Sequence, residues 1–252
     1  MKVAAVLYDP STQEVLCGLE SYYCFEESEN KVENQRLFEL EFDTEEHAIQ
    51  HAIRLSELYQ REIRYSEFEN KRTHYCCLTT NSHMGIIKGN GNKDEKPIEA
   101  IQREISEEVG IIIPLERLRD TLTLSHIKLY TTVYLVPCSN EERQQIEIQI
   151  EERRKRHCGE LFHMAFRNLL TVTHPMNYIT RMVYQWIKKH QLPCLKKHDI
   201  FPITYVPLLP ITYPDKKYDI SFLHEPPFVW GKKRKSLLPI PDNKTLFLHV
   251  LP

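Results

Sequence analysis

Residues 89–111 read GNGNKDEKPIEAIQREISEEVGI, and the other segments of the chain can be placed around them. This stretch carries Glu104, Glu107 and Glu108 at spacings of three and four residues, which puts the three carboxylates on or beside one face of a helix. Like charges at these spacings destabilise an isolated helix by roughly a few tenths of a kcal/mol per pair. A divalent cation would remove that repulsion, and Mg²⁺ binds through a few carboxylates together with waters and substrate phosphates.

The same residues predict where this helix begins and ends. Pro97 suits the first turn, where a missing N–H group costs nothing, and the acidic pair at 94–95 precedes it at the end of a helix that favours negative charge. Gly110 occupies the usual position of a helix stop. An apolar stripe at helical spacing predicts the face turned towards a core, and it consists of Ala100, Ile101, Ile105 and Val109.

Glycines cluster next to the acidic helix. Gly85, Gly89, Gly91 and Gly110 make up four of the seven glycines in the chain. The order is therefore a glycine-bearing loop, a helix with clustered acids, and an apolar run at 111–113. The Nudix box, G-x5-E-x7-R-E-U-x-E-E-x-G-U with U aliphatic, is matched at every defined position by Gly89, Glu95, Arg103, Glu104, Ile105, Glu107, Glu108, Gly110 and Ile111. The chain therefore resembles the Nudix hydrolase family.

This resemblance implies an α/β/α sandwich fold and an enzyme that hydrolyses a diphosphate linked to another group. It implies Mg²⁺ or Mn²⁺ as the cofactor, held by Glu104, Glu107 and Glu108, with the backbone carbonyl of Gly89 as a further ligand. The metal ions would shield the phosphates and lower the pKa of bound water.

Three further side chains have expected roles around this metal site. Arg103 would orient the acids through a salt bridge to Glu107 or Glu95, and Lys88 is placed to contact phosphate as a point charge. Hydrolysis needs a general base, and Glu160 or Glu107 is the candidate. Other acids compete for the role of Glu160, namely Glu147, Glu151 and Glu152.

Composition indicates a globular protein of a reducing compartment. The 252 residues are 41% apolar and 27% charged with a net charge of −2, so the chain as a whole has no electrostatic signature of nucleic-acid binding. Seven cysteines include no CxxC pair, which argues against a zinc site and favours free thiols in the cytosol. No apolar run approaches the ~20 residues of a membrane span. We therefore expect a cytoplasmic protein without a membrane partner.

The regions before and after the box supply the remaining elements of a Nudix domain. The predicted elements are a hairpin at 3–8 and 14–19, strands at 73–78, 112–118, 122–136 and 159–166, and helices at 141–156 and 177–190. We assign 1–25 and 73–190 to the Nudix domain, 26–72 to a helical insertion, and 191–252 to a C-terminal extension that packs on the core.

The insertion is predicted to hold a helix that begins after Asp43 or Thr44, with acids in its first turn and a broad apolar stripe. Two roles are open for this segment. It is either a structural buttress or a lid or recognition element at the mouth of the substrate site. As a lid it would choose the substrate and leave the chemistry unchanged.

Ten of the fifteen prolines lie between 193 and 252, interleaved with aromatic residues. This composition predicts an extended segment that wraps the core with little regular structure. Two basic clusters are either RNA phosphate contacts or solvated surface, and they comprise Arg153, Arg154, Lys155 and Arg156, and Lys232, Lys233, Arg234 and Lys235.

Residues 84–95, MGIIKGNGNKDE, resemble the W-G-x-P-K-G-K…D-E segment of mRNA-decapping Nudix enzymes and related segments of diphosphoinositol-polyphosphate and dinucleoside-polyphosphate hydrolases. Met84 stands in place of the aromatic residue and Ile87 in place of the proline. Larger capped-RNA enzymes of some viruses also have an insertion before the box. The preferred substrate is therefore capped RNA, and diphosphoinositol polyphosphates or nucleotides such as ADP-ribose are the alternatives. A catalytically inactive Nudix-fold module that binds RNA or protein is the alternative of another class.

Overall fold

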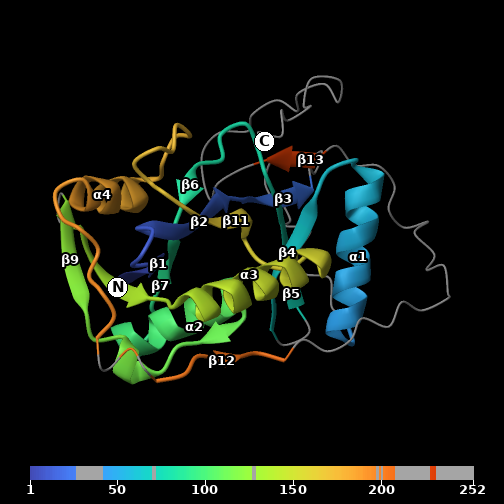
Figure 1. The fold of residues 1–252 in the computed structure, drawn as a ribbon. Coiled ribbons are helices and arrows are strands. Elements are labelled where there is room, and N and C mark those ends of the chain that lie inside the picture. The colour runs from blue at the N-terminus through green and yellow to red at the C-terminus, as the bar shows by residue number, and fades with distance from the viewer. Residues whose placement is uncertain are drawn as a thin grey trace.

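The structure is a computed structural model that describes residues 1–26, 42–69, 72–126, 129–196, 199, 201–207 and 228–230. It is a mixed α/β fold, which confirms the α/β part of the predicted fold class (Figure 1). The helices of the described residues are α1 (Glu45–Leu58), α2 (Pro97–Val109), α3 (Asn140–Lys155) and α4 (Tyr178–Ile187). The strands are β1 (Lys2–Asp9), β2 (Glu14–Glu20), β3 (Tyr22–Glu26), β4 (Ile63–Glu69), β5 (Arg72–Cys77), β6 (Met84–Gly85), β7 (Ile87–Asn90), β8 (Ile111–Ile112), β9 (Thr121–His126), β10 (Leu129–Pro137), β11 (Leu161–Arg167), β12 (Thr204–Tyr205) and β13 (Phe228–Trp230).

The main sheet is mixed and is built around β1. Its strands follow the order β11-β2-β1-β10-β9, with β6 paired to β2 and β7 paired to β1. β1 and β10 run parallel, whereas the other pairs are antiparallel. The predicted first hairpin is confirmed, because Asp9 pairs with Glu14 across its turn. The Asp9 carboxylate accepts a hydrogen bond from the N–H of Ser11 at 2.8 Å, as expected for an aspartate in a turn.

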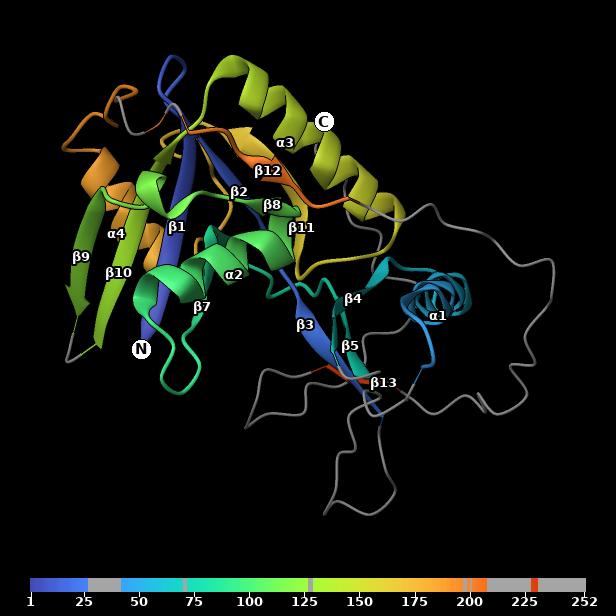
Figure 2. The same ribbon diagram turned by 90° about the horizontal axis from the view of Figure 1, so that it is seen from below.

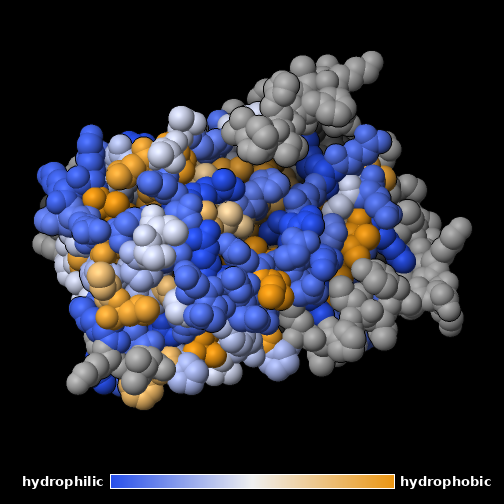
Figure 3. Space-filling view, viewed as in Figure 1, coloured by the Kyte–Doolittle hydropathy of each residue, from blue (hydrophilic) through white to orange (hydrophobic). Residues whose placement is uncertain are grey.

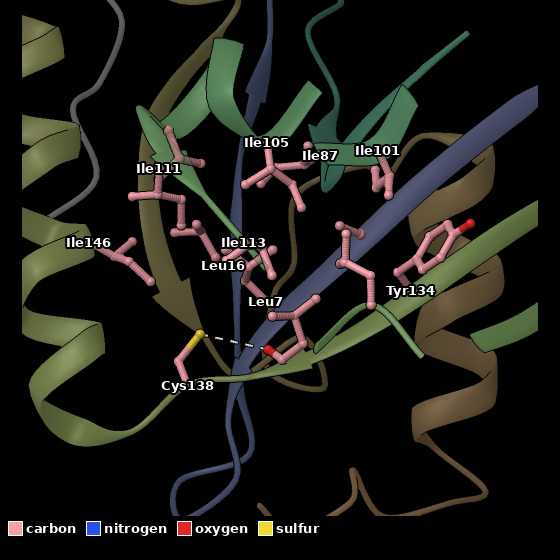
Figure 4. Close-up of a cluster of buried hydrophobic side chains, with 14 of the residues drawn as sticks. Leu7, Leu16, Ile87, Ile101, Ile105, Ile111, Ile113, Tyr134, Cys138 and Ile146 are labelled. Atoms are coloured by element: carbon pink, nitrogen blue, oxygen red, sulfur yellow. Dashed lines mark hydrogen bonds between the residues drawn. The ribbon is translucent and has the colours of Figure 1, made fainter. Parts of the chain in front are cut away.

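Alternation along β1 divides the core between the two faces of this sheet. Val3 and Leu7 belong to one buried cluster, which includes Ile105 of α2 (Figure 4). Ala4 belongs to a second buried cluster, which includes Val183 of α4. Helices therefore cover both faces of the main sheet (Figure 2).

A second sheet follows the order β13-β3-β5-β4 and carries α1 beside it (Figure 2). The predicted start of α1 is confirmed, since the side chain of Thr44 accepts a hydrogen bond from the N–H of His47 at 3.4 Å. Ile49 and Leu55 of this helix pack with Ile63 of β4 in a third buried cluster. The insertion is thus part of a separate small α/β layer.

The prediction of a purely helical insertion over 26–72 needs correction. β4 also lies in this range, and the proposed boundaries at 25 and 72 cut through β3 and β5. β4 was missed because its buried apolar residues, Ile63 and Tyr65, alternate only once, and the buried residues beside them, Arg64 and Ser66, are polar. The predicted strand at 73–78 is confirmed as most of β5.

The prediction of a strand over 112–118 is wrong beyond its first residue. β8 ends at Ile112, and a 3₁₀ turn at Leu115–Arg117 follows Pro114, whose φ of −57° suits the start of a helical turn. Arg117 is fully buried, donates to the backbone oxygen of Pro137 at 2.6 Å and pairs with Glu142. The buried arginine fixes this turn against the main sheet.

After α4, the described residues 191–196 and 201–207 contain one two-residue strand, β12, and no helix, which fits the prediction of little regular structure there. Lys196 and Asp199 form a turn, in which the N–H of Lys196 donates to Asp199 Oδ2 at 2.7 Å. Leu192 and Ile203 are buried, and the Tyr8 hydroxyl donates to the backbone oxygen of Pro193 at 2.8 Å. β12 pairs with β8, and the later β13 pairs with β3. The basic cluster at 232–235 lies outside the described residues. None of the described helices combines the length and apolar character required to cross a membrane.

Candidate active site

The helix that carries the predicted metal ligands has the predicted boundaries. Pro97 occupies the first position of α2, and the N–H of Lys96 donates to Glu99 Oε2 at 3.2 Å. At the other end, Gly110 adopts the left-handed backbone with a φ of 78°. The buried residues of α2 are those of the predicted stripe, Ala100, Ile101, Ile105 and Val109. Capping at both ends and this buried stripe fix the positions from which the acidic side chains extend.

Arg103 contacts three of the site carboxylates. Its Nη1 donates to both oxygens of Glu107, at 3.1 and 2.9 Å, and its Nε donates to Glu95 Oε1 at 3.1 Å. Nη1 also lies 2.9 Å from Glu104 Oε1, and Nη2 donates to the backbone oxygen of Asn90 at 3.1 Å. The sequence predicted a salt bridge from Arg103 to Glu107 or Glu95, and the structure contains both. Arg103 therefore offsets part of the repulsion between the acids.

Glu104 lies directly against the backbone of Gly89. A Cβ atom at position 89 would fall 1.8, 1.9 and 2.2 Å from the three carboxyl atoms of Glu104, so a residue larger than glycine would displace the carboxylate. Burial raises the pKa of Glu104 to about 7; Arg103 lowers it, whereas the charges of Glu107 and Glu160 add to the increase. An approaching cation would stabilise the ionised form of this carboxyl group.

The loop before β11 anchors Glu108. Glu108 Oε2 accepts hydrogen bonds from the backbone N–H groups of Glu160 and Leu161, at 3.2 and 3.1 Å. Burial raises the pKa of Glu108 and the charge of Glu160 raises it further, while the Leu161 N–H and Arg153 lower it. Glu108 and Glu160, which are distant in the sequence, are therefore close enough for the charge of Glu160 to raise the pKa of Glu108.

A cavity of about 300 Å³ adjoins Glu108, whereas Glu104 and Glu107 are not among the described residues that line it. Its wall includes Glu108 and Glu160, and Lys2 and Lys88 contribute cationic groups. Lys88 is ion-paired with Glu20, which also lines the cavity. The structure therefore brings the predicted phosphate ligand Lys88 and the predicted base Glu160 to the same cavity.

Several lining residues were missed by the sequence, including Glu20, Asn177 and Tyr178. Glu20 Oε1 accepts a hydrogen bond from Asn177 Nδ2 at 2.8 Å, and Tyr178 next to it is 40% exposed. In the sequence, Asn177 marks only the start of α4, where its side chain accepts from the N–H of Thr180 at 2.8 Å. Because these residues come from the end of β2 and the start of α4, sequence spacing does not connect them.

The competing acids on α3 lie elsewhere. They pair with basic neighbours on the same helix, Glu147 with Arg143, Glu151 with Arg154 and Glu152 with Lys155. They line a wider, shallower hollow of about 590 Å³ along α3, and the surface over that helix is largely hydrophilic (Figure 3). Of the four candidate acids, Glu160 is the one that shares the cavity with Glu108.

The first predicted basic cluster does not form one common surface. Arg153 Nη2 donates to the backbone oxygen of Glu107, and Arg156 is only 5% exposed. Arg154 and Lys155 are exposed but paired with glutamates. The predicted RNA contact therefore has geometric support only at Arg154 and Lys155 in this cluster.

As they stand, no three histidine, cysteine, aspartate or glutamate side chains of the described residues are grouped to hold a metal ion. The side chains present nevertheless suit a hard cation in kind. Glu104 and Glu108 are carboxyl groups, which Mg²⁺ prefers as ligands, and burial raises the pKa of both. Gly89 has no side chain, so the Glu104 carboxylate can lie directly against its backbone. Arg103 pairs with Glu95, Glu104 and Glu107, and its single positive charge offsets only part of their combined negative charge.

No protein-family model matches the chain, and a search of curated proteins returns no significant match.

Proposed function

We propose that the protein is a Mg²⁺-dependent hydrolase of the Nudix type that cleaves a diphosphate linkage. One observation carries this proposal: Glu104 and Glu108 are held away from solvent near Glu160, whose charge raises the pKa of both, and Glu108 and Glu160 line a cavity together with Lys88. Negatively charged carboxylates that lie close together and away from solvent are unfavourable unless a cation or a proton offsets their charge. A divalent cation and an anionic substrate would together restore the charge balance.

In this proposal Glu104, Glu107 and Glu108 hold the metal, together with the backbone carbonyl of Gly89. The bound ion would supply charge compensation for the diphosphate and activate water. Arg103 holds the acids in position on α2, in agreement with its hydrogen bonds.

Lys88 and Glu160 act on the substrate side of the site. Lys88 can turn from Glu20 to a phosphate oxygen, because an ammonium group on a flexible stem binds as a point charge. Glu160 accepts the proton of the attacking water as general base. Glu107 is the weaker candidate for this role, since both its oxygens accept hydrogen bonds from Arg103.

The charges of the cavity favour a nucleotide-like substrate over a diphosphoinositol polyphosphate. The cationic side chains that line it are Lys2 and Lys88, and Lys88 is already paired with Glu20. A ring that carries many phosphates would need more cations than this. Tyr178 offers an exposed aromatic face for a base to stack on. We therefore retain a capped RNA as the preferred substrate.

A substrate panel tests the proposal. The purified protein is incubated with capped RNA, ADP-ribose, dinucleoside polyphosphates and diphosphoinositol polyphosphates, each with Mg²⁺ and with EDTA. The expected result is Mg²⁺-dependent product release from capped RNA, and its loss in Glu108→Gln. Absence of release from every substrate by a folded wild-type protein would overturn the enzyme proposal.

A binding module is the second candidate function. It is favoured by Arg103, which pairs with Glu95, Glu104 and Glu107 and offsets part of their charge without any metal ion. In that case RNA would bind equally well with Mg²⁺ and with EDTA and would remain intact. The same panel distinguishes the two functions if the recovered RNA is assayed for both binding and cleavage.

A further inference from the structure

The loop between α3 and β11 has an unusual backbone and a direct contact with the candidate site. His157 and Gly159 both have positive φ values, 52° and 98°. A left-handed conformation is unfavourable for a histidine and needs support from its surroundings. The same loop supplies the N–H groups of Glu160 and Leu161 that bind Glu108. The positions of both acids therefore depend on how this loop is held.

β4 of the insertion holds the loop through its backbone. The N–H of Tyr65 donates to the backbone oxygen of His157 at 2.8 Å, and the oxygen of Tyr65 accepts from the N–H of Gly159 at 2.9 Å. These two bonds form a parallel bridge between Tyr65 and Cys158. Tyr65 is itself fixed, because it is buried and its hydroxyl donates to Glu45 Oε1 of α1 at 2.7 Å.

Arg64 contacts the chain immediately after the loop. Its Nη1 donates to the backbone oxygen of Leu161 at 3.1 Å, and its guanidinium carbon lies 4.1 Å from the centre of the Phe162 ring. Glu62 Oε1 accepts from its Nε and Nη2 at 2.8 and 2.6 Å, and Arg64 is 4% exposed. Leu161 is thus held on both sides, since its oxygen binds Arg64 and its N–H binds Glu108.

A further contact fixes His157. Its Nδ1 lies 2.8 Å from the backbone oxygen of Ile63 and 3.2 Å from Ser56 Oγ of α1. The same Ser56 hydroxyl accepts from the N–H of Ile63 at 2.9 Å. Both α1 and β4 are therefore connected to the residue at which the left-handed backbone begins.

We infer that the insertion is a positioning element for Glu108 and Glu160, with Arg64 as its main positioning residue. The inference rests on the proposed function, because it concerns how the acids are held for that reaction. A lid would contact substrate and change KM. Arg64 instead contacts Leu161 and Phe162 and is not among the described residues that line the cavity. Its loss is therefore expected to lower kcat more than it raises KM.

The test compares Arg64→Ala with a matched control, Arg143→Ala. Arg143 is also ion-paired and its guanidinium carbon lies 4.9 Å from the ring of Phe166, which is on β11 as Phe162 is. With the substrate that the panel identifies, Arg64→Ala is expected to lower kcat roughly 10- to 100-fold, as small displacements of catalytic groups do, with KM changed less than about threefold. Arg143→Ala should retain kcat, and Arg64→Lys should restore part of it, because lysine can still donate to Leu161.

Hydrogen exchange supplies a readout that does not require activity. The amides of Glu160 and Leu161 should exchange faster in Arg64→Ala than in wild type, and at the wild-type rate in Arg143→Ala, with folding of each variant checked by thermal melting. Unchanged exchange at these amides, or wild-type kcat in a folded Arg64→Ala protein, would overturn the positioning role. If wild type hydrolyses no substrate, the proposed function fails, and the exchange result alone decides whether Arg64 holds the loop.

Discussion

The Glu108 carboxylate accepts hydrogen bonds from two backbone amides, those of Glu160 and Leu161, at 3.2 and 3.1 Å. Glu108→Gln keeps the size of the side chain and removes the charge. It is expected to lower turnover by roughly two or more orders of magnitude, as loss of an essential electrostatic group does. Turnover at saturating Mg²⁺ is the measurement, and Glu152→Gln on the exposed face of α3 is the control. Near-normal turnover in both Glu108→Gln and Glu107→Gln would contradict the metal assignment.

The raised pKa of Glu104 predicts a pH dependence of stability. In the folded, metal-free protein the pKa is about 7, against an ordinary value of 4.5, so the folded state binds more protons than the unfolded state between these pH values. The free energy of unfolding contributed by this group therefore falls as the pH rises from about 4.5 to about 7. Urea unfolding in EDTA over this range should show a smaller fall for Glu104→Gln than for wild type. Parallel curves for the two proteins would contradict the pKa shift.

At the scale of elements, α2 could be predicted because its signals are local. A proline at the start, a glycine at the end and four apolar residues at helical spacing specify its limits and its buried face. The insertion could be predicted only in part. α1 has a local cap at Thr44, whereas β4 is defined by pairing with β5 and by its bridge to Cys158. Pairing with distant residues cannot be recognised from the seven residues of β4 alone.

A buried histidine makes the insertion sensitive to acid. The ring of His51 in α1 lies 5.4 Å from that of Phe42 and 5.1 Å from that of Tyr75, and neither ring nitrogen has a hydrogen-bond partner in the described structure. Burial lowers its pKa to about 4, and the charge of Arg54 acts in the same direction. Between pH 4 and 6.5 the unfolded state binds more protons, so this contribution to stability is complete above pH 6.5 and is lost as the pH falls towards 4.

His51→Leu should therefore reduce the loss of Tm on acidification between about pH 6.5 and pH 4. Leucine would place an apolar side chain against Phe42 and Tyr75, the ring neighbours of His51, and has no proton to gain. His47→Leu, in the first turn of the same helix, is the matched control and should leave the acid slope of wild type in place. Equal slopes for wild type and His51→Leu would mean that another group causes the acid sensitivity.

At the scale of the whole molecule, the sequence predicted the fold class and the acids of α2, but not how distant segments complete the site. Glu20 and Tyr178 reach the cavity only because β6 joins β2 to α4. β6 pairs with β2, and the backbone oxygen of Met84 in β6 accepts from the N–H of Asn177 at the start of α4. Arg64 reaches β11 through a second sheet that the sequence did not indicate. The predicted basic cluster at 153–156 was misleading, because charge counts in a sequence do not distinguish a solvent-facing arginine from one that binds the backbone of α2.

The substrate preference leads to a prediction about salt dependence. An RNA extends beyond a cavity of about 300 Å³ and needs phosphate contacts elsewhere on the protein. Each such contact that is lost should flatten the plot of log affinity against log salt concentration by roughly 0.7 for a single strand. Arg154 and Lys155 already pair with glutamates, so neutralising them should change the slope little. We therefore expect Lys232, Lys233, Arg234 and Lys235 to account for more of the slope.

The measurement is the Kd of capped RNA for Glu107→Gln protein, which is expected to bind without cleaving, over a series of salt concentrations. Three proteins are compared: the Glu107→Gln background, the same protein with 232–235 neutralised, and the same protein with Arg154 and Lys155 neutralised. Only the protein with 232–235 neutralised should show a clearly flatter plot. Neutralising Arg154 and Lys155 should have little effect, because both side chains are already ion-paired with glutamates. If the background protein itself shows almost no salt dependence, the substrate is held within the cavity alone. A nucleotide then replaces capped RNA as the preferred substrate, since a ligand without a polynucleotide chain releases few counterions.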